Sequence, residues 1–77
     1  MLSNRIKQVL ERIGLTSLPE NKQAKLEQGG LDSLMLALLI IELEREFEIK
    51  IPVIPLEKER YESIHTIEQY LIELGAK

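Results

Sequence analysis

The chain has 77 residues, of which 30% are charged, a formal net charge of −3 and no cysteine. It is long enough for one domain, residues 1–77, near the lower size at which a single core folds without metal or disulfide support, so we expect no deep, walled pocket. Thirteen acids against ten bases argue against a nucleic-acid binder, and the lack of cysteine excludes a disulfide framework, a thiolate nucleophile and a cysteine-based metal site.

Neither a metal site nor a membrane span is expected. A lone histidine, His65, cannot build a zinc cluster. The longest uninterrupted apolar run, Leu34–Ile41, has eight residues, well short of the roughly 18 needed to cross a bilayer. The first residues lead into an amphipathic segment without the apolar region of a secretory signal. These features predict a cytoplasmic protein that does not insert into membranes.

The first predicted helix covers Ser3 to Ile13, with Ser3 as its cap and Gly14 as its stop. Its apolar residues recur at helical spacing: Ile6, Val9, Leu10 and Ile13. Residues 15–31 are mixed and polar, and a structureless loop of that length is unusual in a compact domain. A short helix near Pro19–Gln28 can occupy part of this segment.

A second helix is predicted from Ser33 to Glu48, because Leu, Met, Ala, Glu and Arg favour a helix over a strand. The residues expected to face the core are Leu34, Leu39, Leu43 and Phe47. Residues 49–55, with two prolines among β-branched neighbours, favour extended backbone and end this helix. A brief helix can follow from Pro55 or Leu56 to Arg60.

The final helix is indicated by Thr66 and Gln69 in a capping-box arrangement and by Gly75 as terminator. Its apolar face comprises Ile67, Tyr70, Leu71 and Leu74. Tyr61 and Ile64, which precede it, are expected to fill the core. The pattern as a whole predicts an all-α fold, a small antiparallel bundle of three main helices plus a short extra helix before the last.

Ser33 stands at the start of the long apolar helix, directly after Asp32. A helix N-terminus has free backbone N–H groups and partial positive charge, so a phosphate ester on this serine would be held favourably. The ordinary role of a serine here is a helix cap. However, Gly29 and Gly30 supply backbone freedom, Asp32 offers a second capping group, and Leu34 is expected to anchor the turn. Ser33 is then exposed on rigid support, which suits modification better than catalysis.

A nucleophilic hydrolase is the competing chemical hypothesis, with Ser33 as nucleophile and His65 as the only candidate base. The G-x-S-x-G turn is absent, because Met35 stands where its second glycine would be. A domain this small also offers little wall to exclude water. His65 is more simply a partly exposed residue at the start of the last helix. We therefore expect no enzymatic activity and no catalytic residues.

Met35, Leu38 and Ile41 share a second apolar face of the long helix, apart from its core-facing residues. Such a face either docks partners or lies under the long loops, and the sequence leaves both alternatives open. The charged run from Glu42 to Glu46 is typical of a solvated helix face, and its acids could also steer a basic partner.

Three stretches, Asp32-Ser33-Leu34, Glu46-Phe47-Glu48-Ile49 and Ile51-Pro52, resemble the acyl carrier protein family, and the similarity covers nearly the whole chain. The resemblance implies that Ser33 carries 4′-phosphopantetheine, a flexible thiol-ended arm on which acyl groups are held as thioesters. It also implies that Asp32 caps and positions the modified turn and that Leu34 holds this turn to the core.

The resemblance implies partners as well: a phosphopantetheinyl transferase, a ligase that loads an acyl or aminoacyl group, and downstream biosynthetic enzymes. Two departures point to a specialised rather than a general fatty-acid carrier, since Leu38 stands where Glu is common and the segment Val53–Ile64 is longer than usual. The residues then expected to dock partners are Met35, Leu38, Ile41 and Glu42. Those expected to form the core and flank a cargo cleft are Leu39, Leu43, Phe47, Ile64 and Leu71.

An unmodified helical adaptor, which binds another protein through the apolar face of the second helix, is the alternative function. The cargo of a carrier stays open between a fatty acyl, polyketide, hydroxyacyl or amino-acid group. A monomer is expected, although the apolar face leaves self-association open.

Overall fold

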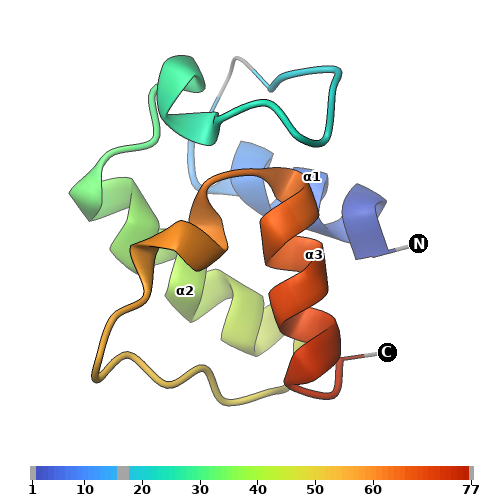
Figure 1. Cartoon of the computed structure of the whole chain (residues 1–77), viewed down its shortest axis with the longest axis vertical. Helices are drawn as coiled ribbons and strands as arrows, with labels where there is room; N and C mark the ends of the chain where they lie inside the picture. The colour runs from blue at the N-terminus through green and yellow to red at the C-terminus, as the bar shows by residue number, and fades with distance from the viewer. Residues whose placement is uncertain (1, 16–17, 77) are drawn as a thin grey trace.

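The computed structural model describes residues 2–15 and 18–76, which form three α-helices and two short 3₁₀ helices (Figure 1). The α-helices are α1 (Leu2–Arg12), α2 (Ser33–Phe47) and α3 (Ile64–Glu73). The 3₁₀ helices are η1 (Leu26–Gly29), which precedes α2, and η2 (Lys58–Tyr61), which precedes α3. The expected all-α architecture of three main helices with a short extra helix before the last is confirmed.

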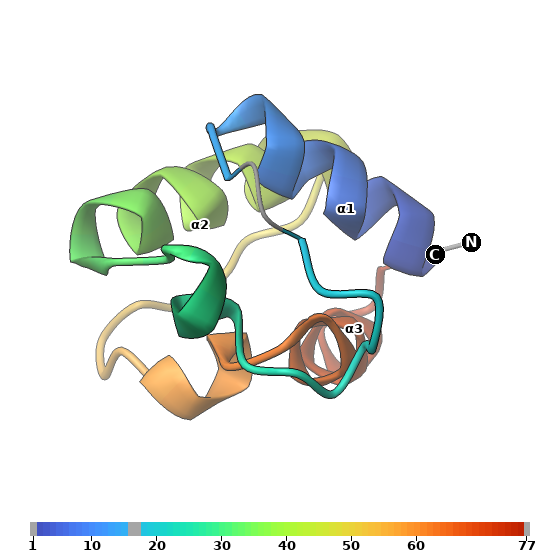
Figure 2. The same ribbon diagram turned by 90° about the horizontal axis from the view of Figure 1, so that it is seen from above.

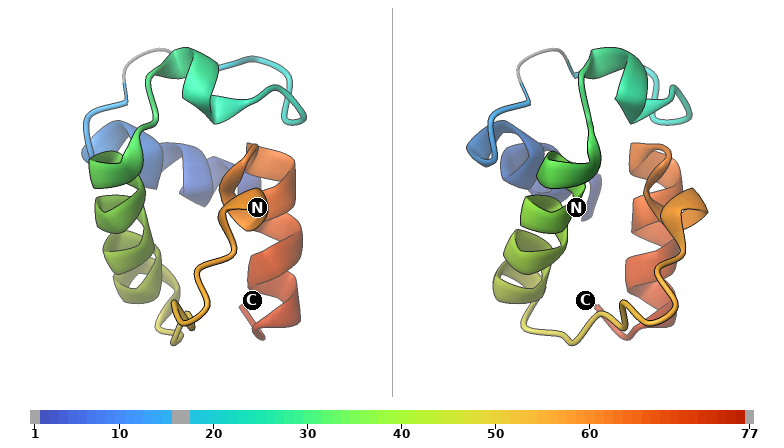
Figure 3. Two further views of the ribbon diagram at one scale, coloured as in Figure 1. Left: turned by 60° about the vertical axis from the view of Figure 1, so that its left-hand side comes forward. Right: turned by 90° about the vertical axis from the view of Figure 1, so that its left-hand side faces the viewer.

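The helices are arranged so that α1 packs against both α2 and α3 (Figure 2). Within the bundle, α2 and α3 run in the same direction, because residues 48–57 carry the chain back along the molecule before α3 begins (Figures 1 and 3). The sequence predicts an antiparallel bundle, and that description does not cover the relative direction of α2 and α3. The return of the chain places η2 on the same side of the bundle as η1 and the first turn of α2 (Figure 2).

The first helix is amphipathic and buries the side chains of Ser3, Ile6, Val9 and Leu10. Ser3 therefore lies inside the helix, on the buried face with Ile6, and the prediction that it caps the helix is wrong. Gly14 ends the helix as predicted, with φ of +108°, a conformation that costs glycine little and other residues more. The backbone N–H of Leu15 then donates to the Leu10 carbonyl at 3.0 Å.

The central helix α2 packs one face into the core through Leu36, Leu39, Ile40, Leu43 and Phe47. Leu34 is not among them, since its side chain is 72% exposed, and the prediction that it faces the core is wrong. Two residues turn a helix by roughly 200°, which places Leu34 on the opposite side from Leu36. The helix ends at Phe47, and Glu48 closes it in the left-handed region with φ of +53°.

The last helix begins earlier than predicted, because Ser63 rather than Thr66 is its cap. The Thr66 N–H donates to Ser63 Oγ at 3.2 Å, and the Ser63 N–H donates to Thr66 Oγ1 at 3.0 Å. The predicted pairing of Thr66 with Gln69 is therefore wrong, although a capping box is present. Gly75, with φ of +94°, ends the helix as predicted.

The first loop contains less helix than expected. A short helix is predicted near Pro19–Gln28, but the structure has only η1, at the end of that segment. The loop is nevertheless joined to the last helix. The backbone N–H of His65 donates to the Lys22 carbonyl at 2.9 Å, and Lys22 Nζ donates to Glu68 Oε1 at 2.9 Å. The polar residues of this loop thus attach it to α3.

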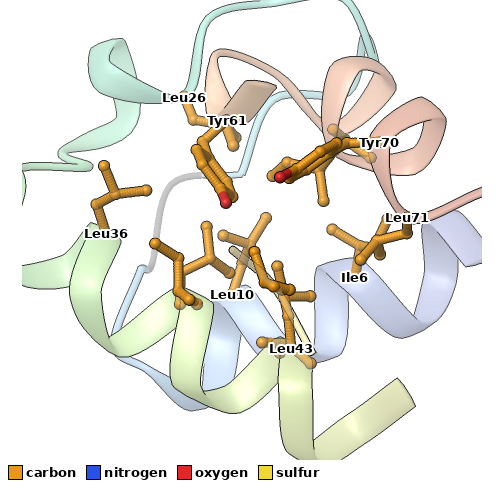
Figure 4. Close-up of a cluster of buried hydrophobic side chains, with 14 of the residues drawn as sticks. Ile6, Leu10, Leu26, Leu36, Leu43, Tyr61, Tyr70 and Leu71 are labelled. Carbon is orange, nitrogen blue, oxygen red and sulfur yellow. The ribbon is translucent and has the colours of Figure 1, made fainter. Parts of the chain in front are cut away.

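Every helix contributes to a single hydrophobic core (Figure 4). The predicted core residues Leu39, Leu43, Phe47, Ile64 and Leu71 are all buried, as are Tyr61 and Tyr70. The two tyrosine rings meet edge to face with 5.9 Å between their centroids. Figure 4 shows Leu26, Leu36 and Tyr61, from η1, α2 and η2, on the same side of this cluster. None of the described helices is long and apolar enough to cross a membrane.

Candidate functional site

Ser33 is the first residue of α2, and its side chain is exposed. Asp32 is the N-cap, because its Oδ1 accepts a hydrogen bond from the Met35 N–H at 2.9 Å. Ser33 is therefore not the cap of this helix. Its hydroxyl stands beside the backbone N–H groups and the positive end of a helix of 15 residues. An acidic group attached to Ser33 would be stabilised there.

The backbone that leads into Ser33 is fixed by a tight turn and by a contact with a distant segment. Gly30 ends η1 with φ of +107°, so this position requires the freedom of glycine, and its N–H donates to the Glu27 carbonyl at 3.1 Å. The Leu26 N–H donates to the Glu62 carbonyl at 2.7 Å. This last bond joins η1 to the residues just before α3.

The side chains that anchor the turn around Ser33 differ from the prediction. Leu34 was expected to hold the turn to the core, but its exposure excludes that role. Leu31 packs partly against the core on one side of Ser33, and Leu36 is buried on the other side. The apolar spacing of Leu36 with Leu39 and Leu43 is the sequence signal that identifies the anchor.

A cavity of about 360 Å³ lies beside Ser33, where η1, η2 and the first turn of α2 meet. Its lining residues are Lys25, Glu27, Leu31, Asp32, Ser33, Leu36, Lys58, Tyr61 and Glu62. The apolar part of the lining consists of Leu31, Leu36 and the ring of Tyr61. Burial, with smaller contributions from Tyr70 and nearby carboxylates, raises the pKa of Tyr61 to about 12, so the phenol is neutral at physiological pH.

The cavity is not flanked by the residues that the sequence indicated. Leu39, Leu43, Phe47, Ile64 and Leu71 all lie in the core, and none of them lines it. These side chains are buried among the helices, so they face the core rather than the surface next to Ser33. Tyr61, which was expected to fill the core, lines the cavity as well.

Apart from Ser33, charged side chains make up the rest of this lining. Lys25 and Lys58 have no ion-pair partner within residues 2–15 and 18–76, and the same holds for the carboxylates of Glu27 and Glu62. Lysines and carboxylates that lie near one another without pairing remain available to a bound group.

His65 does not provide a base for Ser33 in this arrangement. It is the second residue of α3, is partly exposed as expected, and is not among the residues that line the cavity with Ser33. A general base must come within hydrogen-bond reach of its nucleophile. The geometry therefore gives no support to the hydrolase hypothesis.

The outward face of α2 carries an apolar stripe of three leucine and isoleucine side chains. Leu34, Leu38 and Ile41 are 72%, 42% and 53% exposed, and their spacing places them on one side of the helix. We call these residues the α2 stripe. Met35, which was expected to belong to this face, packs partly against the core. The stripe thus keeps Leu38 and Ile41 and gains Leu34.

The acids of α2 are engaged within the molecule. Glu42 lies 3.5 Å from both Arg12 and Arg45, which balance its charge. Glu44 Oε2 accepts a hydrogen bond from the Ile51 N–H at 2.8 Å and so holds the loop that follows α2. This role of Glu44 could not be predicted from the sequence, because it depends on the path of the loop.

Comparison with known proteins identifies one family. The family model described as "Phosphopantetheine attachment site" matches residues 4–71. Comparison with curated proteins found no match to this chain.

Solved structures with a similar chain include three complexes of a ligase with a carrier protein. The first is a complex of Bradyrhizobium japonicum glycine:[carrier protein] ligase with glycylated carrier protein, at 29% identity and a TM-score of 0.74, covering 87% of this chain and 93% of the other. The second is an engineered form of that ligase with a carrier protein from Agrobacterium tumefaciens and ATP, at 26% identity and a TM-score of 0.80, covering 92% and 96%. The third contains the same pair with AMP, at 27% identity and a TM-score of 0.75, covering 90% and 96%.

Proposed function

This chain belongs to the phosphopantetheine attachment-site family, and from that premise we propose that Ser33 is the attachment residue and that the cargo is an aminoacyl group. The carrier role, and a 4′-phosphopantetheine group attached covalently through a serine, follow from the family itself.

The exposure of the serines supports Ser33 as the attachment residue. Ser3 and Ser63 are 8% and 4% exposed, so a transferase would have to unfold part of the helix to reach them. Ser17 lies outside the described residues. Ser33 alone among the described serines is exposed, and it also starts a helix that can stabilise a phosphodiester.

The residues near Ser33 suit the cofactor chemically. A phosphodiester carries one negative charge, and Lys25 and Lys58 line the adjacent cavity beside the N-terminus of α2. When attached, the cofactor supplies the thiol that this cysteine-free chain lacks, and acyl groups are held on that thiol as thioesters. A separate phosphopantetheinyl transferase performs the attachment, so Ser33 acts as its substrate and needs no base beside it.

An aminoacyl cargo is supported by the solved complexes. In each of the three, the similar chain is a carrier protein bound to a glycine:[carrier protein] ligase, and in one the carrier is glycylated. We therefore assign to this chain a loading partner of the amino-acid:[carrier protein] ligase type, acting in the cytoplasm where ATP and coenzyme A are available.

The ligase and the later enzymes of the pathway would dock on the α2 stripe. Its exposed apolar side chains suit a partner with an apolar patch, because apolar and aromatic anchors dominate the energy of protein interfaces. Glu42 lies beside the stripe, but its pairing with Arg12 and Arg45 leaves it a smaller steering role than the sequence indicated.

Intact-mass spectrometry tests the attachment residue. The apo protein is incubated with coenzyme A and a promiscuous phosphopantetheinyl transferase, and we expect the mass to rise by one phosphopantetheine arm. Ser33→Ala should gain no mass while retaining its helical circular dichroism, because only an exposed hydroxyl is removed. A wild-type protein that gains no mass would favour the adaptor function, and a modified Ser33→Ala protein would exclude this serine.

A loading assay tests the cargo. The modified protein is incubated with ATP and candidate amino-acid ligases, and in parallel with acyl-chain-activating enzymes, and the mass of the arm is read before and after hydroxylamine treatment. We expect the addition of an amino acid that hydroxylamine removes. Loading by long acyl chains alone would contradict the aminoacyl assignment and leave the attachment at Ser33 intact.

A further inference from the structure

Two lysines without an ion-pair partner in the described part of the chain lie beside Ser33. Lys22 and Arg60 are paired with Glu68 and Glu73, yet Lys25 and Lys58, near them in the sequence, have no ion-pair partner in the described part of the chain. Both unpaired lysines line the cavity next to Ser33. One comes from the start of η1 and the other from the start of η2, so they approach it from two separate elements.

The two elements that carry these lysines are held together by the backbone. The Leu26 N–H donates to the Glu62 carbonyl at 2.7 Å, which joins the residue after Lys25 to the residue after Tyr61. Tyr61 is 3% exposed, and its ring packs against that of Tyr70. The backbone and the Tyr61 side of the cavity are therefore preformed, and only its exposed charged side chains would be ordered by a group that enters it.

The lining matches the first half of a phosphopantetheine arm. That half contains a phosphodiester, then a carbon with two methyl groups, then a hydroxyl and an amide. The cavity offers cations, an apolar area formed by Leu31, Leu36 and Tyr61, and the carboxylates of Glu27 and Glu62 as acceptors for O–H and N–H donors. Its volume of about 360 Å³ suits a small group of this kind but not the arm together with a long acyl chain.

Resting on the proposed attachment at Ser33, we infer that the first half of the arm lies in this cavity, with its phosphodiester held by Lys25 and Lys58 and its two methyl groups against Leu36 and Tyr61. The thiol end then projects in a defined direction, because the first half of the arm no longer rotates freely. Because both lysines are exposed, the contacts are weak and screened by salt, so a partner enzyme can draw the arm out.

Phosphorus NMR of the modified protein tests this inference. In low salt we expect the phosphodiester resonance of the folded wild type to differ from that of the same protein in urea. The difference should shrink as sodium chloride rises from about 0.02 M to about 0.5 M, because the Debye length falls severalfold over that range. We also expect nuclear Overhauser contacts between the two methyl groups of the arm and the Tyr61 ring.

Variants separate the two lysines from the rest of the surface. Lys25→Gln/Lys58→Gln should already show the urea value in low salt, and each single variant should show an intermediate shift. Lys50→Gln is the matched control, since Lys50 is exposed, has no ion-pair partner in the described chain and does not line the cavity. Its resonance should equal that of the wild type.

The result that overturns the inference is a fully modified wild type whose resonance is unaffected by salt and which shows no contact with Tyr61. Intact mass keeps this failure distinct from that of the proposed function, because Ser33 would still carry the arm. If the double variant is modified too slowly to be measured, the salt series on the wild type decides alone. A wild type that never gains the arm refutes the attachment itself.

Discussion

The two ends of α2 use charged side chains in different ways. At its C-terminal end, Glu46 accepts a hydrogen bond from Arg5 Nε at 3.1 Å and lies 3.4 Å from Arg12, so both arginines join α1 to α2. The Arg5 guanidinium also lies 4.4 Å from the centroid of the Phe47 ring. At the N-terminal end, around Ser33, the lysines and glutamates of the cavity have no such partners among the described residues.

This difference separates stability from function along one helix. The paired charges at the C-terminal end lie between two helices and restrict their relative position. The unpaired charges at the N-terminal end contribute little to folding, because exposed single charges rarely do, and they remain available to a ligand. Substitutions of the paired charges should therefore lower stability, whereas substitutions of the unpaired charges should alter modification or binding.

The largest effect should come from truncation of a buried side chain on α2. Leu43→Ala removes a side chain that is 0% exposed and should lower the free energy of unfolding by about 2–5 kcal/mol. A chain of this length has a total of roughly 4–12 kcal/mol, so this single change removes a large fraction of its stability. Leu34→Ala is the matched control, since the same change at a 72% exposed position should cost less than about 0.5 kcal/mol. Urea denaturation measures both, and equal effects would contradict the assignment of the two faces.

The next effect concerns partner binding at the α2 stripe. Ile41→Asp places a charge in the proposed interface and should lower kcat/KM for ligase loading about tenfold, which corresponds to about 1.4 kcal/mol. Ile72→Asp is the control, because Ile72 is similarly exposed, at 52%, but lies on α3. Attachment of the arm and the melting temperature should change little in either variant. Equal losses for the two variants would show that the stripe is not the docking surface.

A smaller effect separates the cap from the attachment residue. Asp32→Ala removes the hydrogen bond from the Met35 N–H and should lower the free energy of unfolding by about 1 kcal/mol. Ser33→Ala removes no cap and should change it by less than about 0.5 kcal/mol. Thermal denaturation of the two apo variants measures this difference, and a larger loss for Ser33→Ala would reverse the two roles.

The smallest effect is a pH dependence at the paired end. The hydrogen bond from Arg5, followed by the charges of Arg5 and Arg12, lowers the pKa of Glu46 below its ordinary value of 4.5. A carboxylate with a lowered pKa stabilises the fold above its ordinary pKa, and this contribution is lost as the pH falls through the lower folded value. Glu46→Gln should therefore lower the melting temperature at pH 7 and flatten its decline in acid. Glu27→Gln, at the unpaired end, should leave the wild-type curve unchanged.

The positions of the main helices could be predicted because each has an apolar face at helical spacing. The errors arose where two residues could perform the same local task. Leu34 and Leu36 both begin an apolar run, but only Leu36 has the helical spacing to the buried Leu39 and Leu43 that identifies the core-facing side. Ser63 and Thr66 are both residue types that cap helices. Each is followed three residues later by a side chain that can complete a capping box, so the sequence alone does not decide between them.

The candidate site was predictable only in part. Ser33, Asp32 and the glycine turn could be identified because they are adjacent in the sequence, and their order determines the start of the helix. The cavity could not, because Lys25 and Lys58 are far apart along the chain and come near Ser33 only through the fold. The engagement of Glu44 by the Ile51 N–H likewise depends on the path of a loop.

The hydrogen bond from the Ile51 N–H to Glu44 has a consequence for sorting among pathways. Together with the pairing of Glu42 and Glu46 to arginines, it means that each acid within α2 is neutralised or occupied by the protein itself. An enzyme that selects its carrier by a strongly basic surface would gain little attraction here. In a cell with several carrier proteins, enzymes that recognise acidic carriers would therefore bind this one weakly, although none of its elements repels them.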